Sequence, residues 1–165
     1  MIRAATAADL PVVLDLVREL ADYEREPHAV VATEEQFRAA LFGPRPLVHC
    51  LVATDSDSAA GGEVVGFALW FLNFSTWLGT HGIYLEDLFV RPTARGGGHG
   101  RALLTELARI AVAVAGGYGR VEWSVLDWNT PAQGFYASLG ARAQEDWTVW
   151  RLTGDALATL GGATD

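Results

Sequence analysis

A strand, a glycine-rich loop and a helix follow one another in the middle of this chain, and this succession constrains its fold more than any other feature. Leu85–Val90 has the composition of a β-strand, and a helical pattern of apolar residues begins after Arg101. Between them, Gly96–Gly100 holds four glycines, which let successive backbone N–H groups converge ahead of the partly positive helix start. The succession predicts a nest for phosphate oxygens, with Arg95 and Arg101 adding charge-assisted hydrogen bonds. A simple reversal of the chain is the alternative interpretation.

The absence of lysine excludes several classes of phosphate-binding loop and of enzyme. All twelve basic residues are arginine, so the Gly-Lys-Ser/Thr of a Walker loop is absent. The glycine spacing and the lack of a ribose-binding acid also argue against a dinucleotide fingerprint. Without lysine, a Schiff-base enzyme and a lysine general base are excluded.

The overall charge favours a cationic partner. Twenty acidic and twelve basic residues give a net charge of −8, which argues against nucleic acid and suits a small cationic substrate, although it equally suits mere solubility. No segment predicts a membrane span or a signal peptide, so we expect a cytoplasmic protein. His28, His49, His81 and His99 lack metal-ligand spacing, so no metal is expected, and Cys50 is predicted to be a small core residue.

The hydrophobic pattern predicts a single α/β domain over residues 1–165 with a mixed, mostly antiparallel sheet. A helix between the strand ending at Val90 and the next strand implies a parallel pair there. Residues 73–82 are predicted to form an irregular connection. The expected strands are Ile2–Ala4, Val48–Ala53, Val64–Leu72, Ile83–Val90, Val121–Leu126 and Asp146–Leu152; the expected helices begin at Leu10, Thr33, Arg101 and Thr130.

Longer strings then identify a family. Arg95–Gly100 matches the pattern Arg/Gln-x-x-Gly-x-Gly/Ala, and Ile2–Asp9, Tyr84–Val90 and Trp128–Tyr136 extend the match over nearly the whole chain. On these residues the chain resembles the GCN5-related N-acetyltransferases, the GNAT superfamily. Three further segments resemble the diamine acetyltransferases of the spermidine/spermine and thialysine type, namely Glu19–Glu24, Pro46–Ala53 and Trp77–Gly79. The resemblance implies the GNAT fold, with helices on both faces of the sheet and a parallel strand pair at the cofactor site, and a homodimer.

The resemblance also implies acetyl-coenzyme A as the acetyl donor. A bulged strand at Leu88–Val90 would offer backbone groups to its pantetheine arm, and the glycine loop would hold its diphosphate. The implied cofactor residues are Leu88, Phe89, Val90, Arg95, Gly96, Gly97, Gly98, His99, Gly100, Arg101, Asn129, Thr130, Pro131 and Ala132. Asn129 could equally be only a helix cap.

The same resemblance assigns the reacting groups. Tyr136 would protonate the departing thiolate, and Glu86 would accept the proton of the amine, through a water, and contact the amine. The implied substrate residues are Tyr23, Glu24, Trp77, Glu86, Asp87, Glu122, Trp123 and Ser124. Ordinary burial is an equal interpretation for both tryptophans, and Tyr136 could pack behind the cofactor. Glu86 and Asp87 are adjacent, so on a regular strand they point to opposite faces unless a bulge redirects one of them.

These residues predict acetyl transfer directly to a primary amine of a small substrate: a polyamine, a diamine or a lysine-like amino acid. Arg25, Pro27 and His28 follow Glu24, where a long polycation would favour acids, and this weakens spermidine as the substrate. Two alternatives stay open. One is a non-catalytic acyl-coenzyme A sensor, which would bind the cofactor without turnover, and the other is an acetyltransferase of protein amines.

Overall fold

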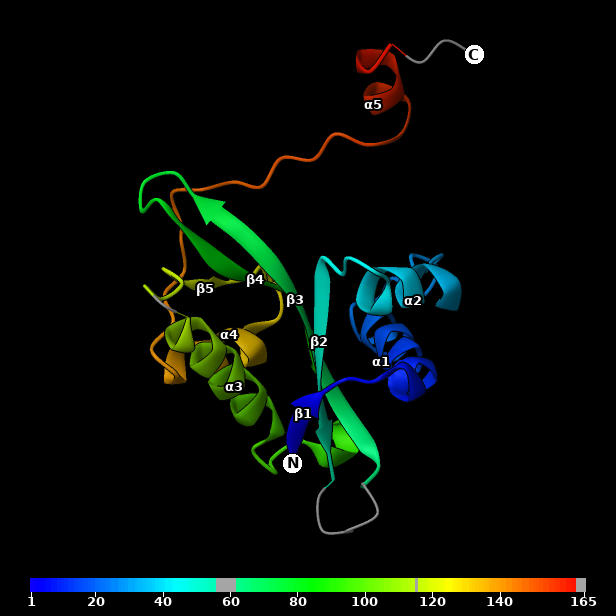
Figure 1. Ribbon diagram of the computed structural model, residues 1–165, viewed down its shortest axis with the longest axis vertical. Helices are drawn as coiled ribbons and strands as arrows, with labels where there is room; N and C mark the ends of the chain where they lie inside the picture. Colours follow the sequence, from blue (N-terminus) through cyan, green and yellow to red (C-terminus); the bar gives the residue numbers. More distant parts are fainter. Residues whose placement is uncertain (56–61, 115, 163–165) are drawn as a thin grey trace. The chain divides into compact units, whose positions relative to one another are not determined.

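A sheet of five strands forms the centre of the computed structural model, which describes residues 1–55, 62–114 and 116–162. The strands follow chain order across the sheet (Figure 1): β1 (Ile2–Ala4), β2 (Val48–Thr54), β3 (Val64–Ser75), β4 (Thr80–Val90) and β5 (Val121–Glu122). Neighbours are antiparallel except for β4 and β5, which are parallel. The predicted mixed sheet with one parallel pair is therefore confirmed.

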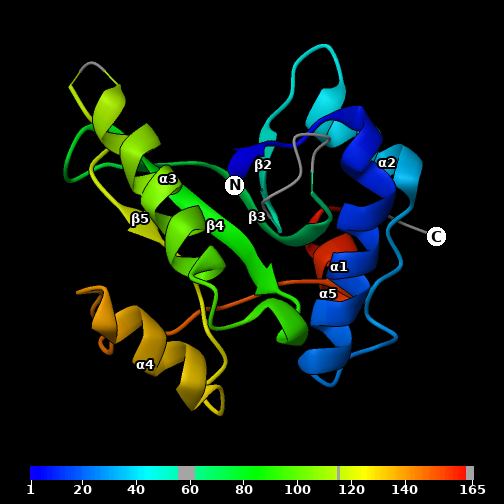
Figure 2. The ribbon, with the colours of Figure 1, turned by 90° about the horizontal axis from the view of Figure 1, so that it is seen from below.

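Helices cover both faces of this sheet (Figure 2), as the GNAT resemblance implied. On one face lie α1 (Leu10–Tyr23) and α2 (Glu34–Phe42), and on the other lies α3 (His99–Ala113). Short 3₁₀ turns, Ala7–Asp9 and Pro92–Ala94, precede α1 and follow β4. The core beneath α1 joins its inner residues to Phe67, Leu69 and Phe89, and burial of such side chains is the main stabilising term.

The two helices on the first face begin where the sequence predicts. At α2, the Thr33 hydroxyl accepts a hydrogen bond from the Gln36 backbone N–H (3.3 Å), and the Thr33 backbone N–H donates to the Gln36 side chain (2.8 Å). Before α1, the Asp9 carboxylate accepts hydrogen bonds from the backbone N–H and the hydroxyl of Thr6, both at 2.7 Å. A capping box of Thr33 and Gln36 thus begins α2, and the pair of Thr6 and Asp9 precedes α1 with Asp9 as the acceptor.

Residues 73–82 correct the prediction of an irregular connection, because most of them belong to β3 and β4. The two strands pair out to Ser75 and Thr80, and a short turn joins them. Gly79 permits this turn with a φ of 65°, and its N–H donates to the Ser75 carbonyl (2.8 Å). The rings of Phe74 and His81 meet across the pair at 5.4 Å, so side-chain pairing carries the hairpin further than the local sequence indicated.

Two strand predictions in the last third of the chain are wrong. Val121–Leu126 is a strand only at Val121–Glu122, and Asp146–Leu152 is not a strand. Alternation of apolar residues indicates a side-chain pattern, but a strand also needs a neighbour for its backbone groups. A helix that the sequence analysis did not predict, α5 (Gly154–Leu160), follows this segment.

The chain divides into two compact units, Met1–Ser124 and Val125–Asp165. The first holds the whole sheet with α1, α2 and α3, and the second holds α4 (Thr130–Ser138) and α5. The single domain over residues 1–165 stays a prediction. Among the described residues, no helix has the length and apolar character to cross a bilayer.

Candidate active site

An extra residue in β4 shapes the candidate site. Leu69 pairs with Asp87, but the next residue of β3, Trp70, pairs with Leu85, so Glu86 is left over as a bulge. Paired residues share a face of the sheet. Asp87 therefore shares the face of Leu69, and Tyr84, which pairs with Phe71, lies on that face too. The resemblance implied a bulge at residues 88–90, and this is wrong; the structure places the bulge at Glu86, the residue expected to accept the proton of the amine.

Three carboxylates gather around this bulge: Glu24 after the end of α1, Glu86 and Asp87. Burial, with the nearby charges of Glu86 and Glu24, raises the pKa of Asp87 to about 6. Burial also raises the pKa of Glu24. Burial and both neighbouring charges raise the pKa of Asp87, and no cation among the described residues lowers it. An ammonium group placed here would relieve this repulsion.

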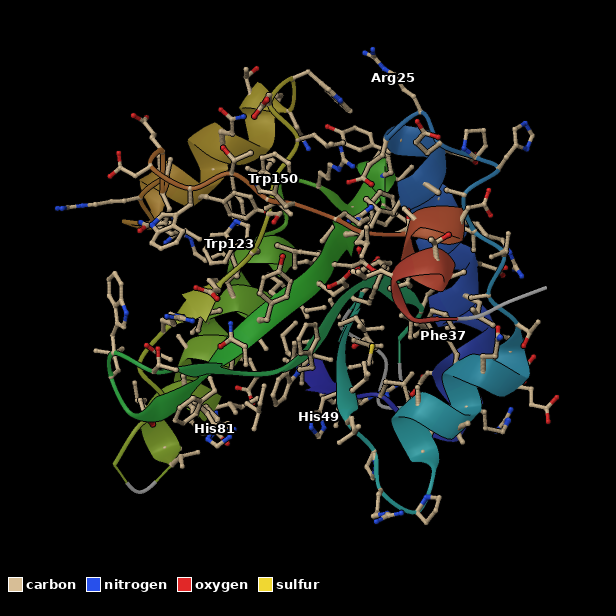
Figure 3. The ribbon with its side chains drawn as sticks, turned by 90° about the horizontal axis from the view of Figure 1, so that it is seen from above. Arg25, Phe37, His49, His81, Trp123 and Trp150 are labelled. Carbon is tan, nitrogen blue, oxygen red and sulfur yellow. The ribbon has the colours of Figure 1, made fainter. Side chains whose placement is uncertain are left out.

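Three of the predicted substrate residues thus lie near enough in the folded chain for their charges to interact. Arg25, which follows Glu24, adopts a left-handed φ of 66°, and its side chain points away from the end of α1 (Figure 3). The left-handed residue Arg25 follows the end of α1 directly, so the chain changes direction immediately after Glu24.

Arg95 lies against Tyr23, which occupies the last position of α1. Its guanidinium carbon is 4.9 Å from the centre of the Tyr23 ring and 5.7 Å from that of Phe89. Its Nε donates a hydrogen bond to the Val90 carbonyl (3.0 Å). The side chain expected to bind phosphate therefore contacts a predicted substrate residue.

The edge of β4 that faces away from β3 offers backbone groups. The Arg91 N–H donates to the Val65 carbonyl (2.9 Å), and in an antiparallel pair hydrogen-bonded positions alternate with positions that point outward. Phe89 therefore bonds to β3, while Leu88 and Val90 direct their N–H and carbonyl groups to the other edge. Along the described chain, β5 pairs with β4 only at Ile83 and Tyr84, so it does not cover Leu88 or Val90.

This edge fits the implied contact with a pantetheine arm at Leu88 and Val90. Phe89 differs from them, because its side chain is buried in the core beneath α1 and its backbone groups face β3. Phe89 is therefore a packing residue of the core.

The glycine loop forms the turn that the sequence analysis anticipated. Gly96 (φ 84°) and Gly98 (φ 80°) are left-handed, a conformation costly for other residues, and Gly98 caps α3. At Gly97, an added Cβ would lie 3.3 Å from the His99 ring. The loop glycines are exposed, His99 and Gly100 are half-buried, and Arg101 is exposed on the first turn of α3. The N–H groups at this helix start fit a diphosphate.

The predicted substrate segment on β5 is engaged within the protein. The Glu122 carboxylate lies 2.8 Å from Nε of Arg120 and accepts a hydrogen bond from the Asn73 amide. The Ser124 hydroxyl is 3.0 Å from the Tyr84 hydroxyl. Figure 3 shows Trp123 beside these strands, where it is half-buried. Because Glu122 is already paired with a cation, its place is better explained by the fold than by amine binding.

Trp77 is the predicted residue that the structure places apart. It lies in the turn between β3 and β4 and is 86% exposed. Glu86 lies six positions beyond the first residue of β4, which is about 20 Å along an extended strand. Within the first unit, Trp77 is therefore remote from the carboxylate cluster.

The second unit carries the remaining predicted residues on α4 and its cap. Asn129 is buried, and its side-chain oxygen accepts a hydrogen bond from the Ala132 N–H (3.3 Å). Pro131 occupies the first turn, where its missing N–H costs little, and Thr130 is exposed. Tyr136 is half-buried, with its ring 5.4 Å from that of Phe135. Both interpretations of Asn129 remain compatible, since a cap can also present the N–H groups of its helix.

Tyr84 and Gln133 each lie beside predicted site residues of their own unit, and the sequence singled out neither. Tyr84 joins the face of Asp87 only because the bulge changes the alternation, and no sequence pattern marked that change. Gln133 donates hydrogen bonds to the carbonyls of Leu126 (3.2 Å) and Asp127 (3.0 Å), fixing the segment before α4. An amide on the helix turn after a cap is a signal that could have found it.

The described residues offer few groups for nucleophilic catalysis or for metal binding. Burial, followed by the charges of Asp9 and Asp87, raises the pKa of Cys50 to about 12, so the thiol stays protonated and unreactive. The prediction that Cys50 is a small core residue is confirmed. His49 and His81 stand on different strands, well apart in Figure 3. Among the described residues, no group of three or more His, Cys, Asp or Glu side chains could hold a metal ion.

The sequence model of the Acetyltransferase (GNAT) family matches residues 13–141. The chain belongs to the GNAT family. It is 40% identical to a thialysine N-epsilon-acetyltransferase of Bos taurus, over 98% of this chain and 97% of that protein. It is 34% identical to an L-ornithine N5-acetyltransferase of Arabidopsis thaliana, over 96% of this chain and 86% of the relative.

A solved structure shares the architecture of this GNAT protein. An integron cassette protein from the mobile metagenome of V. cholerae superimposes with a TM-score of 0.76 at 28% identity, covering 98% of this chain and 96% of that one. The family match and the full-length relatives make this chain an N-acetyltransferase and confirm the resemblance to the thialysine type.

Proposed function

We propose that this GNAT enzyme transfers an acetyl group from acetyl-coenzyme A directly to a primary amine of a small substrate. The observation that carries the proposal is the cluster of Glu24, Glu86 and Asp87 at the β4 bulge, beside an open strand edge and a glycine loop. Like charges held together in a partly buried place are unfavourable unless a cation joins them. An alkylammonium group is the cation that an N-acetyltransferase has to recognise.

The chain offers groups for each part of the donor. The outward backbone groups of Leu88 and the outward N–H of Val90 suit the pantetheine arm, and the loop from Gly96 to Arg101 suits the diphosphate. Asn129–Ala132, at the start of α4, would add contacts from the second unit. Acetyl-coenzyme A supplies the acetyl group as an activated thioester. A backbone N–H aimed at the acetyl oxygen would stabilise the developing negative charge, a contribution of about 2.7–4 kcal/mol where such a donor has been removed from other enzymes.

Three proton transfers accompany the reaction. The bound ammonium loses a proton to Glu86, directly or through water, since an ammonium is not a nucleophile. The amine nitrogen then forms a bond to the acetyl carbon, the bond from that carbon to sulfur breaks, and Tyr136 protonates the thiolate. The second proton that leaves the nitrogen restores the Tyr136 hydroxyl. Asp87 and Glu24 hold the amine as counter-charges. The inert Cys50 supports direct transfer, because a covalent intermediate would need an activated thiol.

The substrate class follows from the cluster and from the relatives. The thialysine and ornithine enzymes are named for amino acids with a side-chain amine, and this favours a lysine-like amino acid over a polyamine. Glu122 is paired with Arg120, so it adds no acid for a longer polycation. We extend the proposal to a homodimer, which the resemblance implied.

Turnover with a panel of amines tests the proposal. Free thiol release would be followed with acetyl-coenzyme A and thialysine, lysine, ornithine, putrescine or spermidine. We expect the amino acids to be acetylated most efficiently, and Tyr136→Phe to lower kcat at least about 100-fold while the affinity for acetyl-coenzyme A changes little. Full activity of Tyr136→Phe would remove Tyr136 from its role.

The same experiment separates the two alternatives. A sensor would bind acetyl-coenzyme A in calorimetry yet turn over no amine. An enzyme for protein amines would acetylate peptides in preference to every small amine of the panel.

A further inference from the structure

The Arg95 side chain joins two parts of the candidate site that the sequence separates. It belongs to the loop between β4 and α3, whereas Tyr23 ends α1, on the other face of the sheet. The guanidinium lies over the Tyr23 ring at 4.9 Å and near the Phe89 ring at 5.7 Å, and Nε is fixed on the Val90 carbonyl at 3.0 Å. The two rings and one carbonyl therefore define its position.

Such a contact holds an aromatic ring in one place. A guanidinium is planar, stacks on ring faces and is only weakly hydrated, so it can bind a carbonyl and an aromatic face at the same time. Tyr23 is also the residue directly before Glu24. The chain turns immediately afterwards, at the left-handed Arg25. A fixed Tyr23 therefore fixes the backbone from which the Glu24 carboxylate reaches the cluster.

We infer that Arg95 is a positioning residue for the amine site: it holds Tyr23, and through it Glu24, in register with the cofactor loop. This inference rests on the proposed function and deepens it. The first residue of the glycine-loop pattern then serves amine recognition more than diphosphate binding. Arg101, exposed on the first turn of α3, is left as the arginine that suits the diphosphate.

Two matched substitutions test this division of roles. Arg95→Gln removes the charge and the stacking plane but keeps an amide that can bond to the Val90 carbonyl. We expect it to raise KM for the amine about three- to tenfold and to change KM for acetyl-coenzyme A less than twofold. Arg101→Gln should do the reverse. Arg95→Lys, which keeps the charge without the plane, should restore little of the loss.

Coupling between Arg95 and Tyr23 is measured with a double-mutant cycle. Once Tyr23→Leu has removed the ring, adding Arg95→Gln should raise the amine KM less than twofold further. Independent, multiplying effects of the two substitutions would overturn the inference. So would an Arg95→Gln variant that raises KM for acetyl-coenzyme A and leaves the amine KM unchanged.

A readout without turnover separates this inference from the proposed function. Hydrogen exchange of the unliganded protein, followed on a peptide spanning residues 20–29, should be at least threefold faster in Arg95→Gln than in the original protein or in Arg101→Gln. Equal exchange in all three proteins would overturn the positioning role even if the enzyme is active. Faster exchange combined with no turnover of any amine would instead overturn the proposed function alone.

Discussion

At the scale of single residues, Asp87 shows the cost that a functional group imposes on a fold. Its carboxyl is held away from water and among other carboxylates, and these two causes raise its pKa to about 6. Groups with such shifted pKa values concentrate at functional sites. The sequence could name Glu86 and Asp87 as neighbours, but their surroundings depend on α1, which lies more than sixty positions earlier in the chain.

Asp87→Asn is predicted to stabilise the folded protein at pH 8. A carboxyl whose pKa rises on folding favours the folded state below its ordinary pKa, and this contribution is lost as the pH rises through about 6. The substitution should therefore raise the free energy of unfolding by about 1–3 kcal/mol at pH 8 and change it little at pH 4. Urea unfolding at both pH values measures this. Glu145→Gln, at an exposed position outside the cluster, is the control, with an expected change within about 0.5 kcal/mol at either pH.

The same titration should appear in catalysis. Below about pH 6, Asp87 takes up a proton and its attraction for an ammonium is lost. We expect kcat/KM for the amine to fall on the acid side with an apparent pKa near 6. In the Asp87→Asn variant, kcat/KM for the amine should be about tenfold lower and should no longer fall on the acid side. An unchanged acid limb in the variant would assign the titration to another group.

At the scale of elements, short sequence patterns predicted the starts of helices better than the extents of strands. The starts of α1 and α2, the glycine cap of α3 and the Asn129 cap of α4 were all visible as short patterns. The hairpin through Phe74 and His81 and the bulge at Glu86 were not, because both depend on which residue of the neighbouring strand lies opposite. Pairing across a sheet is a tertiary property that one strand's sequence does not contain.

Asp9 is predicted to be the ionic residue on which the start of α1 depends. Its carboxylate binds both terminal nitrogens of Arg3 at 2.7 Å and accepts two bonds from Thr6. Hydrogen bonds from Arg3 hold the pKa of Asp9 well below its usual range, so the stabilisation is present at neutral pH and is lost as the pH falls below about 4. Asp9→Asn should lower the free energy of unfolding by about 2–3 kcal/mol at pH 7.

The exposed pair of Arg18 and Asp15 provides the comparison. Asp15→Asn removes an ion pair of 2.8 Å on the outer surface of α1 and should cost less than about 0.5 kcal/mol. Urea unfolding of both variants at pH 7 and pH 3 distinguishes them, since the Asp9 effect should shrink at the lower pH. A loss of equal size in the two variants would contradict the role given to Asp9.

At the scale of the whole molecule, family membership required long matches rather than chemical patterns. A glycine loop, two acids and a tyrosine were each compatible with plain structural roles, and the strings around them identified an acetyltransferase. The gathering of Glu24 with Glu86 and Asp87 could not be predicted from spacing, because it depends on how α1 lies on the sheet. The position of Trp77, at the far end of β4, could not be predicted either.

The net charge of −8 predicts opposite salt responses for the two substrates. A negative protein attracts a cationic amine over long distances and repels an anionic cofactor, and salt screens both effects. Raising the ionic strength from 0.02 M to 0.5 M should lower kcat/KM for a diamine by about three- to tenfold and leave unchanged or raise that for acetyl-coenzyme A. Steady-state kinetics at constant pH measures this, with sodium chloride and potassium acetate compared to exclude a specific anion effect. Parallel losses for both substrates would contradict the prediction.

The bulge makes position 86 an extra residue of β4 that pairs with no residue of β3. Exchanging the Glu86 side chain leaves the path of β4 intact, and deleting the residue would restore a strict two-residue repeat. The pairs of Leu69 with Asp87 and of Trp70 with Leu85 would then follow one another directly, so the buried Ile83 and Leu85 would keep their faces. We therefore expect loss of the residue to spare the packing of β4 and to remove the acid from the cluster, so that the extra position serves the chemistry of the site and not the sheet.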